Sequence, residues 1–140
     1  AKLVDNCLNF SEAFILHQEG KFGVALSLLS RVNFPWVLLK IQVKIMQIQL
    51  NYQLGFLEET RDIIDNFRKM LTKEVSVSTD YKNSVLGFLK FTIRLITLHE
   101  LTDKKKKSLE ISRFKDELLA CQPNHFGVRF WLEDRLKEIV

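Results

Sequence analysis

The residue types that most often bind metals or act as nucleophiles are few and widely spaced in this sequence. Its three histidines are His17, His99 and His125, and its two cysteines are Cys7 and Cys121. A zinc site needs three or four such ligands that converge, and the motifs HxxxH, HExxH and CxxC are absent. We therefore interpret the histidines as ordinary helix-end residues and the cysteines as unpaired thiols that are buried or half-buried. The sequence predicts no metal and no other cofactor.

The usual motifs of covalent catalysis and nucleotide binding are also missing. Neither GxSxG nor a glycine-rich phosphate loop is present, and Gly20-Lys-Phe-Gly23 is too short to be a P-loop. Carboxylate pairs such as Glu58 and Glu59 fall on the polar side of a predicted helix, which is typical of a solvated surface. We expect no enzymatic activity. An enzyme with an unfamiliar site remains an alternative, which a deep pocket with several titratable groups would support.

Four consecutive lysines, Lys104 to Lys107, form the densest cluster of charge. The whole chain has 21 basic and 17 acidic residues, and its net charge of +4 is well short of that of a nucleic-acid-binding arm. The run is either a phosphate-binding patch or the solvated start of a helix. Protein or peptide is the predicted partner, and a nucleic-acid-binding or regulatory role for this run is the alternative function.

Helices are the elements expected to position all of these residues. The 140 residues are 46% hydrophobic, as in one water-soluble domain, and 5 Gly and 2 Pro supply few turns for an all-β fold. Apolar residues recur at steps of three and four along seven segments, at about residues 8–16, 21–32, 35–54, 56–72, 80–101, 103–121 and 125–139. We expect Pro35 in the first turn of the third helix and Asn124 as the cap of the seventh. One of Ser78, Thr79 and Asp80 should cap the fifth.

The ends and the apolar stretches bear on location and on the hydrophobic core. The longest uncharged stretch, residues 45–57, has 13 residues and includes three glutamines and one asparagine, so it is too short and too polar to span a bilayer. The opening AKLVDNCLNF contains neither an apolar signal segment nor an initial Met. We expect a cytoplasmic location, no membrane span and an excised piece of a longer protein.

We interpret Trp36 and Trp131 as core residues.

A pattern that begins in the stretch HQEGKFGVALSLL, residues 17–29, recurs along the chain. Each copy begins with a residue that has a ring side chain and ends three residues later at a predicted turn. The copies are His17-Gln-Glu-Gly20, Tyr52-Gln-Leu-Gly55 (35 residues later) and His99-Glu-Leu-Thr102 (a further 47 residues later). Downstream apolar positions agree as well, in the sets Leu29, Ile64 and Ile111, and Val32, Phe67 and Phe114. Each time, a helix that ends near a ring is expected to turn tightly into a second amphipathic helix. Such hairpins bury their apolar faces by stacking on one another.

A helix–turn–helix unit of this length resembles the tetratricopeptide repeat. The small, turn, aromatic and small residues that this family prefers are here Ala13, Gly20, Phe22 and Ala25. The resemblance is good over residues 8–34, fair over 40–71 and weak over 83–121, where Lys107 replaces the second small residue. The whole chain also resembles helical C-terminal segments of large bacterial tetratricopeptide-like proteins. The resemblance implies one all-α domain of stacked antiparallel hairpins, with units at about 5–34, 35–72 and 80–121 and a capping helix at 124–140.

In tetratricopeptide stacks the first helix of each unit lines a concave groove. Carried over position by position, this gives a candidate peptide-binding groove of Phe14, His17, Gln18, Gln42, Gln49, Tyr52, Gln53 and His99. Amide side chains bond the backbone of an extended peptide, and rings supply contact area. The alternative is a solvated helix face or one covered by an adjoining domain. The predicted function is a non-catalytic interaction or scaffold module that binds a peptide or neighbouring domain on its concave face.

Overall fold

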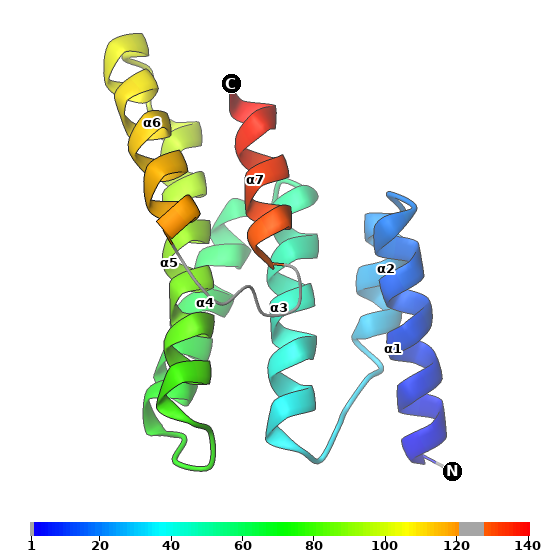
Figure 1. The fold of residues 1–140 in the computed structure, drawn as a ribbon. Helices are drawn as coiled ribbons and strands as arrows, with labels where there is room; N and C mark the ends of the chain where they lie inside the picture. Colours follow the sequence, from blue (N-terminus) through cyan, green and yellow to red (C-terminus); the bar gives the residue numbers. More distant parts are fainter. Residues whose placement is uncertain (1, 121–127) are drawn as a thin grey trace. The chain divides into compact units, whose positions relative to one another are not determined.

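A computed structural model of the chain describes residues 2–120 and 128–140, and these residues are helical with no strand among them. The helices are α1 (Lys2–Gln18), α2 (Phe22–Leu29), α3 (Val37–Gln53), α4 (Leu57–Lys73), α5 (Thr79–Glu100), α6 (Lys104–Ala120) and α7 (Val128–Ile139) (Figure 1). The predicted all-α class with seven helices is confirmed. None of these helices has both the length and the apolarity that a membrane span requires.

Two compact units make up the chain, Ala1–Val77 and Ser78–Val140. The first holds α1 to α4 and the second holds α5 to α7. The division falls in the connector between the second and third predicted repeat units.

Several details of the predicted helix bounds were wrong. The first helix begins at Lys2 rather than near Leu8. The third begins at Val37, because Trp36 has an extended backbone (φ −95°, ψ 138°), so Pro35 precedes the helix instead of lying in its first turn. The predicted cap Asn124 lies outside the described residues, as do Cys121 and His125.

The two turns of the first unit are the same motif at a spacing of 35 residues. Gly20 and Gly55 have φ values of 80° and 81°, the left-handed region that a residue without a Cβ adopts freely. In the first turn the Gly20 amide donates to the His17 carbonyl (3.1 Å) and the Lys21 amide to the Leu16 carbonyl (2.9 Å). These are the two hydrogen bonds of a Schellman motif.

The second turn repeats this bonding with different side chains. The Gly55 amide donates to the Tyr52 carbonyl (3.0 Å), and the Phe56 amide donates to the Asn51 carbonyl (2.9 Å). The helices that follow also match, because Ala25 and Thr60 occupy equivalent positions and both are fully buried. Thr60 fits a buried site because its hydroxyl donates to the Phe56 carbonyl (2.7 Å). The two turns therefore share their backbone hydrogen bonds, and Ala25 and Thr60 share their burial.

The core of the first unit joins the α1–α2 hairpin to α3. It consists of buried apolar side chains, namely Ala13, Ala25, Leu29, Val32, Phe34, Val43, Met46 and Leu50. The small side chains of Ala13 and Ala25 are fully buried where α1 and α2 pack together. Close packing of this kind stabilises through many short apolar contacts. The second hairpin thus begins by burying one side of its first helix against the hairpin before it.

The connections before and after α5 in the second unit do not use the glycine turn of the first unit. Ser78 caps α5, and its hydroxyl accepts from the Tyr81 amide (3.2 Å), as one of the three predicted caps. No glycine stands between α5 and α6, where Leu101 has an extended backbone (φ −76°, ψ 128°). Phe88 and Trp131 join α5 to α7, with ring centroids 5.9 Å apart. The third predicted unit is therefore a helix pair without the glycine turn of the first two.

Candidate functional site

The predicted groove residues lie in both units and differ in exposure. In the first unit Phe14 and Gln18 are exposed and Gln42 and Gln53 are half-buried, whereas His17, Gln49 and Tyr52 are buried. His99 is exposed and belongs to the second unit. The accessible members of the predicted groove in the first unit are therefore Phe14, Gln18, Gln42 and Gln53, which we call the α1–α3 face.

One contact joins the first helices of the two hairpins. Nε2 of His17, in the last turn of α1, lies 2.5 Å from Oε1 of Gln53, in the last turn of α3. An amide oxygen only accepts, so the imidazole donates through Nε2–H in this pair. The His17 ring also meets the edge of Phe22, with centroids 5.8 Å apart. The structure thus brings His17 and Gln53 together, and it fixes the ring of His17 as part of the packing between α1, α2 and α3.

A hollow near the start of α1 was not predicted. It has a volume of about 450 Å³ and is lined by Lys2, Leu3, Asn6, Asn33, Phe34, Pro35, Trp36 and Lys40. Two of the lining residues, Asn6 and Asn33, are joined by two hydrogen bonds. The side-chain amide of Asn6 donates to the Asn33 carbonyl (2.8 Å), and the side-chain oxygen of Asn6 accepts from the Asn33 backbone amide (3.0 Å). Trp36 is 53% exposed at the rim, so its assignment to the core was wrong. The lining carries two lysines and no acid.

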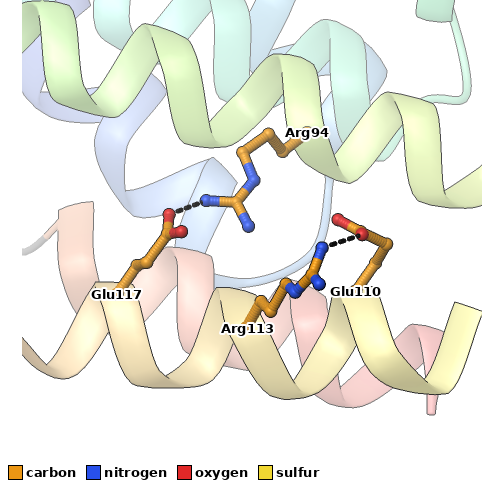
Figure 2. A network of polar contacts seen from close by, with 4 residues as sticks. All are labelled: Arg94, Glu110, Arg113 and Glu117. Atoms are coloured by element: carbon orange, nitrogen blue, oxygen red, sulfur yellow. Dashed lines mark hydrogen bonds and ion pairs between the residues drawn. The ribbon is translucent and has the colours of Figure 1, made fainter.

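Arg94 holds α5 against α6. Its guanidinium pairs with the Glu117 carboxylate of α6, and on the same helix Arg113 pairs with Glu110 at 3.0 Å (Figure 2). The Arg94 guanidinium also lies over the rings of two phenylalanines, 5.6 Å from the centroid of Phe91 and 5.1 Å from that of Phe114. Those two rings meet edge to face at 5.1 Å.

A charge that is paired and stacked on aromatic faces in this way stabilises a helix contact. The cavity beside Arg94 measures only about 80 Å³, which is small for a ligand. The cluster of Arg94, Phe91, Phe114 and Glu117 is therefore best explained as structural.

The lysine run begins α6, and its helix end is already occupied by a carboxylate. Oδ1 of Asp103 accepts from the backbone amides of Lys105 (3.0 Å) and Lys106 (3.2 Å). Two of the first amides of α6 are therefore already bonded, and of the lysine side chains Lys104 to Lys106 are exposed and Lys107 is half-buried. Nucleic-acid binding by this run stays a prediction.

Metal ligands do not gather in the part of the chain that the structure describes. No group of three or more His, Cys, Asp or Glu in residues 2–120 and 128–140 is arranged to hold an ion. Cys7 is a free thiol and is exposed on α1, so its predicted burial was wrong. It lies on a side of α1 against which no described helix packs closely enough to cover it.

His99 predicts a pH dependence of stability. Partial desolvation lowers the pKa of His99, the positive charge of Lys107 lowers it further, and Glu138 opposes both. The folded chain therefore takes up this proton at a lower pH than the unfolded chain, whose histidine pKa is about 6.5. The contribution of His99 to stability is complete above about pH 6.5 and declines as the pH falls below that value.

We expect His99→Asn to make the urea midpoint less sensitive to pH. Wild type should lose more stability than the variant between about pH 7.5 and pH 5. The midpoints are measured by circular dichroism at both pH values, with the exposed Asn83→Ala as a control that keeps the wild-type dependence. An identical pH dependence in wild type and His99→Asn would contradict the assignment to His99.

Comparisons of the chain with protein-family models, with curated proteins and with solved structures found no match. Function is therefore inferred from the contacts and exposed surfaces of the chain itself. The four residues of the α1–α3 face are uncharged and come from the first helices of two successive hairpins.

Proposed function

We propose that the chain is a non-catalytic protein-interaction module that binds an extended segment of a protein partner on the α1–α3 face. The observation that carries the proposal is the repeated glycine turn. It ends α1 and α3 in the same way, and the contact between His17 and Gln53 joins these two helix ends. The α1–α3 face takes its side chains from the first helices of both hairpins, and Gln18 and Gln53 stand at equivalent positions 35 residues apart.

The chemistry of the α1–α3 face suits an uncharged, extended ligand. Three of its four side chains are primary amides, a group that can donate and accept hydrogen bonds, and the oxygen of one of them, Gln53, already accepts from His17. Phe14 is half exposed and adds apolar contact area. With no charge on the face, recognition depends on backbone hydrogen bonding and ring contact rather than on ion pairs. Binding should therefore depend weakly on salt.

Peptides selected from a display library against the intact chain provide the test. We expect the double variant Phe14→Ala with Gln18→Ala to weaken the selected peptides by about tenfold or more, since loss of a central ring commonly costs that much affinity. Both residues are exposed, so the fold should survive. Affinities are measured by titration calorimetry.

The matched control changes two exposed residues of α4, Asn66→Ala with Lys69→Ala. It should bind the selected peptides as wild type does. Equal affinity in wild type, the α1–α3 variant and the control would show that the peptides bind elsewhere and would overturn the proposal.

A further inference from the structure

The hollow between α1 and the segment that leads into α3 has walls held by contacts within the chain. The Asn6 side chain is bonded twice to the backbone of Asn33, which ties α1 to the connector between α2 and α3. Phe34, also in the lining, is buried and meets the ring of Phe10 edge to face, with centroids 5.8 Å apart. Walls that are fixed in this way are preorganised for a ligand, which then binds at a smaller cost in conformational entropy.

The charge of the lining has one sign. Lys2 and Lys40 are exposed, and neither forms an ion pair with another residue in the part of the chain that the structure describes. Asp5, one turn after Lys2, is exposed but does not line the hollow, and the first turn of α3 contains no acid. Two ammonium groups without a carboxylate in the same lining make the hollow electropositive, so it favours an anion.

The rim of the hollow adds an exposed aromatic ring. Trp36 is 53% exposed, and its carbonyl accepts from the Lys40 amide (3.0 Å) in the first hydrogen bond of α3. The indole ring and the Lys40 ammonium group therefore belong to one end of the same helix, one turn apart. An indole at a wet rim offers apolar area to a planar ring of a ligand.

We propose that this hollow binds a small anion that carries a planar ring, an aromatic carboxylate or an aromatic phosphate. The ring packs on the indole of Trp36, and the anionic group pairs with the ammonium groups of Lys2 and Lys40. The volume of about 450 Å³ lies within the range of small-molecule sites, about 300–1,000 Å³. The lining shares no residue with the α1–α3 face, so this site does not depend on the proposed function.

Four probes separate the contributions of the ring and the charge. Benzoate and phenyl phosphate carry both, benzamide carries the ring without the charge, and acetate carries the charge without the ring. Binding to the intact chain is followed by nuclear magnetic resonance of the indole Nε1–H signals of Trp36 and Trp131, which Trp36→Phe assigns. Trp131 is an internal control, because it belongs to the second unit, where its ring packs against Phe88.

We expect benzoate and phenyl phosphate to shift the Trp36 signal saturably, and the tighter of the two identifies the anionic group. Benzamide and acetate should bind at least about tenfold more weakly than that probe. The double variant Lys2→Gln with Lys40→Gln should weaken the anionic ring compounds by about tenfold or more, since it removes both positive charges of the lining. Both lysines are exposed, so the fold should survive.

The matched control is Lys69→Gln with Lys73→Gln, which changes two exposed lysines of α4 and removes the same net charge. It should bind the probes as wild type does. The proposal is overturned if benzamide binds as tightly as benzoate and phenyl phosphate, or if the variant at Lys2 and Lys40 binds as tightly as the control. It is also overturned if neither anionic ring compound shifts the Trp36 signal saturably up to about 10 mM.

Discussion

Replacing Leu50 with alanine lowers the free energy of unfolding by about 2–5 kcal/mol, whereas Ile15→Ala changes it by no more than about 0.5 kcal/mol. The two residues occupy equivalent positions 35 residues apart. Leu50 is fully buried in the core between α3 and the α1–α2 hairpin, so alanine leaves a cavity. Ile15 is more than half exposed on α1, where alanine removes little buried surface and is the better helix former.

Urea unfolding followed by circular dichroism measures both variants against wild type. Because the chain has two compact units, the curves are fitted with one or two transitions as their shape requires. Hydrogen exchange in α1 to α3 locates the loss in the first unit. Equal losses for Leu50→Ala and Ile15→Ala would contradict the different burial of these two repeat positions.

Helix content and the first two turns were predictable because both depend on local sequence. Apolar spacing showed the helices, and the glycines at positions 20 and 55 marked the turns, since only glycine adopts φ near +80° without strain. The early start of α1 was missed because Leu3 and Val4 are exposed, so residues 2–7 show no buried side. A helix that lacks a covered face leaves no amphipathic pattern to read.

The candidate site was less predictable because it depends on how helices cross. Spacing placed His17 and Gln53 on first helices, but it did not show that their side chains meet. Gln49 and Tyr52 read as a polar helix face, yet both are buried. Trp36 reads as core by its apolar ring, but the extended backbone before α3 leaves it at the rim of a hollow. Each of these outcomes is set by tertiary packing that the spacing of residues does not contain.

The third predicted unit departs from the repeat for a reason visible in its turn. Thr102 stands where the earlier units have glycine, and Asp103 caps α6 through its side chain instead. A carboxylate cap starts a helix without requiring a left-handed residue before it. The weaker resemblance over residues 83–121 thus corresponds to a different way of joining two helices.

Alanine at position 20 and alanine at position 23 have opposite effects on stability. Gly20→Ala lowers the free energy of unfolding by about 1–2 kcal/mol, because a Cβ disfavours the left-handed backbone that the first turn requires. No atom lies within 4 Å of that Cβ, so the cost comes from the backbone alone. Gly23→Ala raises stability by about 0.5–1 kcal/mol, because Gly23 lies inside α2 with equally open space around its Cβ.

Thermal and urea unfolding of the two variants and wild type, under the same conditions, show whether each substitution raises or lowers the free energy of unfolding. Both substitutions reduce the freedom of the unfolded chain in the same way, so a difference in sign isolates the backbone of the folded state. Gly55→Ala should behave as Gly20→Ala does, since the second turn has the same φ and the same two hydrogen bonds. A neutral Gly20→Ala with a costly Gly55→Ala would mean that the two turns are not equivalent.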